Sequence, residues 1–204
     1  NKENQINEIL WALNITGYEC KYSDPRFSKT YEYGIFREQY MTLEEYKKKY
    51  FDSSRPYTVG LLESNMYVSN GQLQPYYALI KSLEAKGCNV IPVVAAGGSE
   101  NQLKVMVKYF TNAPSYEAYL NNPLKYTNNV NAIISMPAYG IGGNLFDNTT
   151  KYFETAGVPV FRAVHSDYVS NEEWELSATG LPGNRSDKWW HVAIGEAQGI
   201  IEAT

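Results

Sequence analysis

Asn131–Gly143 of this 204-residue chain reads NAIISMPAYGIGG, and its pattern returns in three other parts of the sequence. A short apolar run stops abruptly at Pro137, and a glycine-containing loop follows. The glycines of that loop are Gly140, Gly142 and Gly143. A continuous apolar run bounded by turn residues is typical of a strand buried on both faces. The glycines allow the backbone to turn sharply or to lie close against another group.

The strand pattern recurs, and helical patterns separate its copies. Strands are predicted at 57–62, 89–94, 131–136 and 158–164, and the helices between them at 75–86, 100–110, 115–120 and 145–156. A last helix is predicted from Ser186 or Asp187 to about Ala203. Strand–helix alternation at this spacing indicates an α/β fold with a parallel sheet. We expect about four strands with helices on both faces, in a Rossmann- or flavodoxin-like arrangement.

The N-terminal part lacks this alternation. Residues 3–13 have helical spacing, residues 17–40 form an aromatic and polar segment without periodicity, and Thr42 with Glu45 makes a capping box before a helix that ends near Tyr50. We therefore expect a small helical and irregular appendage over 1–55 and an α/β domain over 56–204.

Composition excludes some functions. The net charge of −4 and the absence of a basic cluster speak against a nucleic-acid surface. No apolar run approaches the roughly 18 residues of a membrane span. Cys20 and Cys88 are compatible with free thiols or with one bridge. Because the chain begins at Asn1 rather than Met, we expect a piece of a longer protein.

Ligands of open parallel sheets bind beyond the carboxyl ends of the strands. In this chain those ends are followed by candidate binding residues from three loops: Glu63, Asn65, Gly97, Gly98, Tyr139, Gly140, Gly142 and Gly143. His165 follows the fourth strand, where a surface histidine is the simpler interpretation. The glycine loops lack the patterns of nucleotide-binding loops, and two histidines with two cysteines at these spacings do not make a zinc site. The residues alone thus indicate a pocket along one edge and no named reaction.

The order of the motifs carries a resemblance over residues 30–204. The motifs are Tyr33-Gly34-Ile35, Leu43–Tyr46, Arg55–Leu62, Tyr77–Gly87, Asn89–Val93 with Gly97-Gly98, Ala132–Gly143, Gly157–Val160, Glu173-Trp174, Gly180-Leu181, and Val192–Ile194 with Glu196 and Gly199. In this order and spacing they resemble the family of the cobaltochelatase large subunit and the magnesium chelatase H subunit.

The resemblance implies a role in inserting cobalt or magnesium into a tetrapyrrole, which is chemistry of a ligase that forms nitrogen–metal bonds. It implies a tetrapyrrole substrate, AAA+ ATPase subunits as partners, no cofactor resident in this piece, and a cytoplasmic location. Glu196 and His165 become the candidate catalytic residues, since a carboxylate would accept pyrrole protons or guide a divalent metal. A surface acid on a helix is the alternative interpretation of Glu196. The metal-ligating residues stay open.

The chain also departs from the family's pattern. Asn65, Tyr67 and Gln72 stand where family members carry charged or other polar residues, and the Pro-Glu-x-Asp-Gly pattern becomes Gly195-Glu-Ala-Gln-Gly199. These losses, the abundant tyrosine and asparagine, and sequons at Asn14, Asn148 and Asn184 favour an alternative. It is a non-catalytic chelatase-like module of a larger surface or adhesin-like protein at the cell surface. On the chelatase interpretation, Gly142→Val is expected to weaken ring binding and leave the fold intact.

Overall fold

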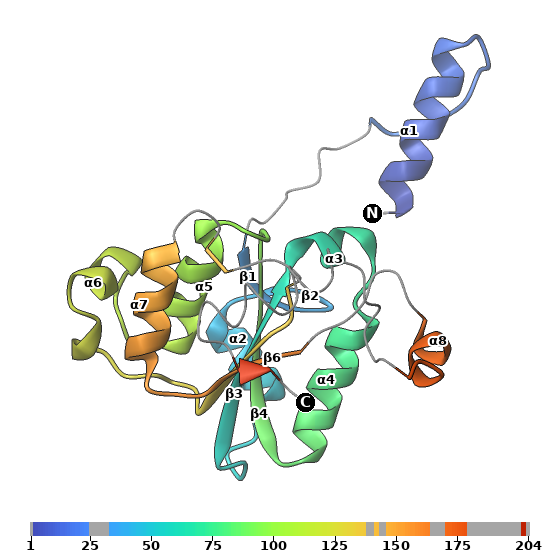
Figure 1. The fold of residues 1–204 in the computed structure, drawn as a ribbon. Helices are drawn as coiled ribbons and strands as arrows, with labels where there is room; N and C mark the ends of the chain where they lie inside the picture. Colours follow the sequence, from blue (N-terminus) through green and yellow to red (C-terminus); the bar gives the residue numbers. More distant parts are fainter. Residues whose placement is uncertain are drawn as a thin grey trace. The chain divides into compact units, whose positions relative to one another are not determined.

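The computed structural model describes most of the chain (Figure 1). The described residues are 2–24, 33–137, 141–142, 146–163, 170–178 and 201–202. They divide into two compact units, residues 1–31 and residues 32–204, and the first unit contains the helix α1 (Lys2–Ile15). None of the described helices is both long and apolar enough to cross a bilayer.

The second unit is built on one sheet of seven strands in the order β2-β1-β4-β3-β5-β6-β7. Their bounds are β1 (Tyr33–Arg37), β2 (Gln39–Met41), β3 (Tyr57–Ser64), β4 (Cys88–Ala95), β5 (Ala132–Ser135), β6 (Val160–Arg162) and β7 (Ile201–Glu202). The strands β4, β3, β5, β6 and β7 are parallel, and β1 and β2 add an antiparallel margin. Counted along the chain, the parallel strands follow the order 2-1-3-4-5.

The four predicted strands are confirmed as β3, β4, β5 and β6, but the predicted count is wrong. The aromatic segment before Thr42 has no strand periodicity, yet it supplies β1 and β2. Ile201 pairs with Phe161, so the predicted last helix does not extend to Ala203. The findings support an α/β fold with a mostly parallel sheet, without singling out a Rossmann-like arrangement. Because residues 33–41 belong to the sheet, the units divide at 31/32 rather than at the expected 55/56.

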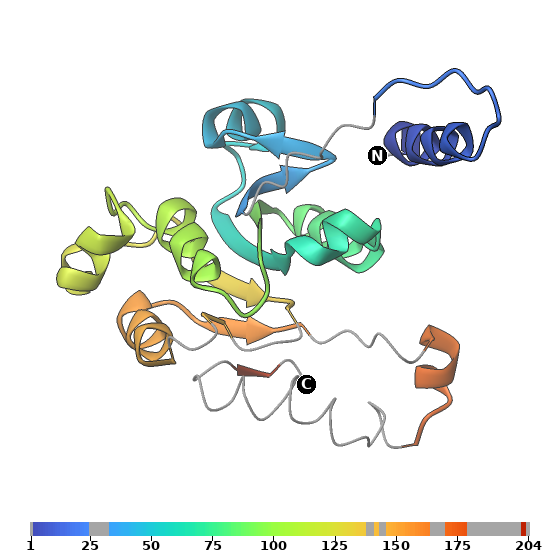
Figure 2. The same cartoon turned by 90° about the horizontal axis from the view of Figure 1, so that it is seen from above.

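Helices cover both faces of the sheet (Figure 2). The described helices of this unit are α2 (Leu43–Tyr50), α3 (Asn65–Asn70), α4 (Gln74–Ala85), α5 (Glu100–Phe110), α6 (Tyr116–Asn121), the 3₁₀ turn η1 (Pro123–Lys125), α7 (Phe146–Ala156) and α8 (Asn171–Glu175). Figure 2 shows α5, α6 and α7 on one side of the sheet and α4 on the other. Local signals start these helices as predicted: Thr42 and Glu45 form the capping box of α2, and Pro75 lies in the first turn of α4.

Two hydrophobic clusters fill the spaces between the layers. The larger one lies between the sheet and α5, α6 and α7, and includes Leu62, Leu103 and Tyr152. The smaller one lies between the sheet and α4, and includes Leu61 and Ile80. Adjacent residues of β3 enter different clusters because successive side chains of a strand point to opposite faces. This explains why the sequence of β3 reads as a continuous apolar run.

Gly60 sets the distance between the sheet and α5. A Cβ atom at this position would lie 2.8 Å from Cζ of Phe110, which is too close for any real contact. The aromatic ring therefore lies directly over the strand backbone. Glycine is required here for close approach rather than for an unusual backbone conformation.

Candidate functional site

The carboxyl ends of the central strands meet along one edge of the sheet. Ser64 pairs with Ala95, and Ser135 pairs with both Leu62 and Arg162, so β3, β4, β5 and β6 end close together. The chain leaves β3 toward β4 and leaves β5 toward β6, in opposite directions along the sheet. Such a switch point is where open α/β sheets place their ligands. We call this region, with the loops that follow the strands, the carboxyl edge.

Glu63 brings a buried carboxyl group to the carboxyl edge. Its residue is 2% exposed, and its Oε1 accepts a hydrogen bond from the backbone N–H of Ser64 at 2.6 Å. Burial raises the pKa of Tyr76 well above its usual range, and the nearby charges of Tyr46 and of Glu63 add to this effect. Burying a carboxylate costs free energy, and the hydrogen bond from Ser64 offsets part of that cost. Asn65 is half-buried at the start of α3.

The turn after β4 offers exposed backbone at the same edge. Gly97 and Gly98 are exposed, and Gly98 has a φ of 63°. Ser99 closes the turn by donating its hydroxyl to the carbonyl oxygen of Ala96 at 2.6 Å. Since two consecutive residues have no side chains, a flat ligand would be able to approach the backbone here.

Buried side chains hold the described backbone of the loop after β5. Arg162, which is 1% exposed, donates from Nη2 to the carbonyl oxygen of Pro137. Gly142 donates its N–H to Oε1 of Gln102 at 3.1 Å, and the Thr149 hydroxyl donates to the carbonyl oxygen of Ile141 at 2.9 Å. These three side chains come from β6, α5 and α7.

Gly142 has a structural role in this loop. Its φ is 79°, and a Cβ atom would collide with Oγ1 of Thr149 and lie 3.1 Å from Cδ1 of Leu103. The expectation that Gly142→Val leaves the fold intact is therefore wrong, because the protein itself occupies the space that a side chain needs.

The sequence-predicted site residues fall into two groups. The structure brings Glu63, Asn65, Gly97, Gly98 and Gly142 to the carboxyl edge, with Gly142 buried. The others, Tyr139, Gly140, Gly143, His165 and Glu196, lie outside the described residues.

Sequence reasoning missed the buried polar residues that surround the loop. Arg162 had a signal, since it is the one charged residue of the strand pattern VPVFRAV. Gln102 and Thr149 had none, because polar residues on a helix are normally assigned to its solvent face. Both are fully buried.

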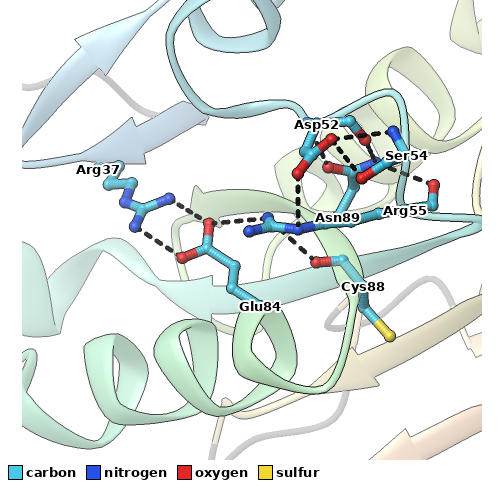
Figure 3. A network of polar contacts seen from close by, with 7 residues as sticks. All are labelled: Arg37, Asp52, Ser54, Arg55, Glu84, Cys88 and Asn89. Carbon is cyan, nitrogen blue, oxygen red and sulfur yellow. Dashed lines mark hydrogen bonds and ion pairs between the residues drawn. The ribbon is translucent and has the colours of Figure 1, made fainter.

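The opposite edge of the sheet carries a network of polar contacts (Figure 3). Arg37 donates from Nη1 to Oε1 of Glu84 at 2.6 Å and from Nη2 to Oε2 at 3.0 Å. Nη1 of Arg55 lies 4.0 Å from the same Oε1. Asn89 accepts from the N–H of Asp52 and donates to its carbonyl oxygen. Burial alone would lower the pKa of Arg37, but the hydrogen bonds to Glu84 and Tyr46 raise it above its usual value. We call this region, near the start of β4, the amino edge. Its contacts join β1, α4, β4 and the connector before β3.

The described residues do not form a metal centre. No group of three or more histidine, cysteine, aspartate or glutamate side chains lies within the described ranges in a geometry that would hold a metal ion. Cys20 and Cys88 are both free thiols.

A family model and several known proteins match this chain. The family model CobN/Magnesium Chelatase matches residues 1–204. An uncharacterized protein of Methanocaldococcus jannaschii is 29% identical over 80% of this chain, and the chloroplastic magnesium-chelatase subunit ChlH of Oryza sativa subsp. indica is 28% identical over 85% of it. The aerobic cobaltochelatase subunit CobN of Sinorhizobium is 25% identical over 72%.

The solved structure of the catalytic subunit of cobaltochelatase from Mycobacterium tuberculosis has the same fold. It superimposes with a TM-score of 0.55 and 14% identity over 93% of this chain and 14% of that one. The chain spans 13% of the length of the first two relatives and 10% of the Sinorhizobium protein. Nothing in these similarities supports a surface or adhesin-like module. From the full-length match and the shared fold, this chain belongs to the CobN/magnesium chelatase family.

Proposed function

We propose that this chain is a domain of a metal-chelatase large subunit and that its carboxyl edge forms part of the wall of a tetrapyrrole site. The observation that carries the proposal is the meeting of three features at one switch point. They are the buried carboxyl group of Glu63, the exposed Gly97-Gly98 backbone and the anchored loop after β5. Membership of the CobN/magnesium chelatase family supplies the ligand class.

The chemistry of metal insertion suits these groups. A free-base ring must lose its pyrrole protons when a divalent metal enters, so a base close to the ring assists the reaction. Glu63 is the described residue that fits this role, and His165 and Glu196 remain candidates proposed from the sequence. Carboxylate oxygens also attract magnesium and accept cobalt. On this proposal the metal is a substrate, the AAA+ ATPase subunits are partners, and the location is cytoplasmic.

Ring binding is tested by quenching of the tryptophan fluorescence of the 204-residue chain. We expect protoporphyrin or a hydrogenobyrinate-type ring to quench at micromolar concentration. Gly97→Val places a branched side chain on the exposed turn without backbone strain, because Gly97 is not among the glycines with positive φ. It should weaken the ring affinity obtained from the quenching about tenfold, which corresponds to a loss of about 1.4 kcal/mol in binding free energy.

Ser53→Val is the matched control, since Ser53 lies in an exposed turn near the amino edge. It should change ring affinity less than twofold. Absence of quenching by either ring, with circular dichroism showing a folded chain, would refute ring binding by this domain. Equal effects of the two variants would refute the assignment to the carboxyl edge.

A further inference from the structure

The anchors of the loop after β5 have an arrangement that goes beyond packing. The carbonyl of Pro137 is held by β6, and the backbone at Ile141 and Gly142 is held by α7 and α5. These anchored positions belong to the loop after β5, which is one of the three features of the proposed ring site. Three elements from different parts of the chain thus hold three described positions of the backbone that follows β5.

The three side chains that hold this backbone are polar or charged and buried, and burying such groups costs free energy. Arg162 is 1% exposed, and Gln102 and Thr149 are fully buried. Replacing a buried charged residue by a well-packed apolar one is often neutral or stabilising, so stability alone does not explain an arginine here. Each of these side chains instead forms a hydrogen bond with a backbone atom of Pro137, Ile141 or Gly142. These hydrogen bonds fix the position of the backbone there.

We propose that Gln102, Thr149 and Arg162 act together as positioning residues that hold the backbone of Pro137, Ile141 and Gly142 where ring binding at the carboxyl edge requires it. This inference rests on the proposed function for its ligand. It assigns these residues no contact with the ring, because they act on the loop backbone from within the protein.

Thr149→Val tests the proposal because it removes the hydroxyl and keeps the shape. Gln102→Leu removes the acceptor of the Gly142 N–H. Thr149→Ser is the conservative variant, because it keeps the hydroxyl that Thr149→Val removes. Arg162 is left unchanged, since removal of a buried guanidinium would confound loop position with global stability.

Thr111→Val is a matched control. Thr111 is 4% exposed, and its hydroxyl donates to the carbonyl oxygen of Val107 at 2.7 Å at the far end of α5. It therefore loses a buried hydroxyl-to-carbonyl hydrogen bond of the same type away from the loop, together with the hydrogen bond that this hydroxyl accepts from the N–H of Ala113 at 3.1 Å.

Two measurements are needed: the hydrogen exchange rate of the Gly142 amide and the affinity for protoporphyrin. Thr149→Val and Gln102→Leu should each accelerate exchange and weaken ring affinity about fivefold, which is the scale of one hydrogen bond. Thr149→Ser and Thr111→Val should stay within about twofold of the parent chain in both measurements.

The two proposals fail in different ways. If Thr149→Val accelerates exchange at Gly142 no more than Thr111→Val does, the anchoring is overturned whatever the ring data show. If exchange accelerates while ring affinity is unchanged, the positioning role is overturned. If the parent chain binds no ring, the proposed function falls, and the exchange rates alone decide whether these residues hold the loop.

Discussion

The two edges of the sheet use polar groups in different ways. At the amino edge, polar side chains from separate elements bind one another and nearby backbone, as Arg37 binds Glu84 and Asn89 binds Asp52. At the carboxyl edge, the buried groups hold a loop or stand at the end of a strand. Some have no hydrogen-bond partner among the described residues, such as Ser135 Oγ and Gln102 Nε2. The polar contacts of the amino edge thus join elements to one another, whereas those of the carboxyl edge hold the backbone that follows a strand.

The largest expected effect comes from a methyl group at the carboxyl edge. Gly142→Ala combines a strained φ of 79° with a collision against Thr149, whereas Gly157→Ala adds the strain alone, since its φ is 65° and nothing lies within 4 Å. We expect a loss in the free energy of unfolding of about 3 kcal/mol for the first and about 1 kcal/mol for the second. Urea denaturation measures both. Equal losses would show that the loop has room for a side chain.

A smaller loss in the free energy of unfolding is expected when the ion pair between Arg37 and Glu84 at the amino edge is broken. Glu84→Leu leaves the half-buried Arg37 without its carboxylate partner, and we expect a loss of about 2 kcal/mol in the free energy of unfolding. The double variant with Arg37→Met should lose less than the sum of the two single variants, because the partners are removed together. Ring affinity should not change. A loss below about 0.5 kcal/mol would place this contact with ordinary surface ion pairs.

The smallest effect has the opposite sign. Ser135 is fully buried, and its hydroxyl has no partner among the described residues. Ser135→Ala should raise the free energy of unfolding by up to about 1 kcal/mol, because an unsatisfied hydroxyl leaves the core. Thermal unfolding would show this as a higher Tm. A lower Tm would mean that the hydroxyl is already satisfied, and the contrast between the edges would weaken.

The parts of the fold that local patterns determine were predictable. Buried parallel strands read as apolar runs, so β3, β4, β5 and β6 could be found, and capping residues located α2. The strands β1 and β2 could not, since β1 is fixed by pairing with β4, a neighbour distant in sequence.

The candidate site was predictable as a location and less so as chemistry. Topology alone placed Glu63 and Gly97 at the carboxyl edge. The sequence does not reveal that Gln102 and Thr149 turn inward, because tertiary packing rather than helical periodicity decides which polar residues are buried. Gly142 was assigned to a ligand wall because a glycine pattern does not distinguish an approaching ligand from an approaching side chain.

The contact between Gly60 and Phe110 has a consequence for the divergence of this family. The side chains at positions 60 and 110 share one space. A methyl group at position 60 would therefore require a smaller side chain at position 110, or α5 would have to move away from the sheet. Because α5 also carries Gln102, outward movement would shift the anchor of a loop at the other end of the helix. A substitution at either of two residues remote from the proposed site would thus move Gln102 without any change in the site residues themselves.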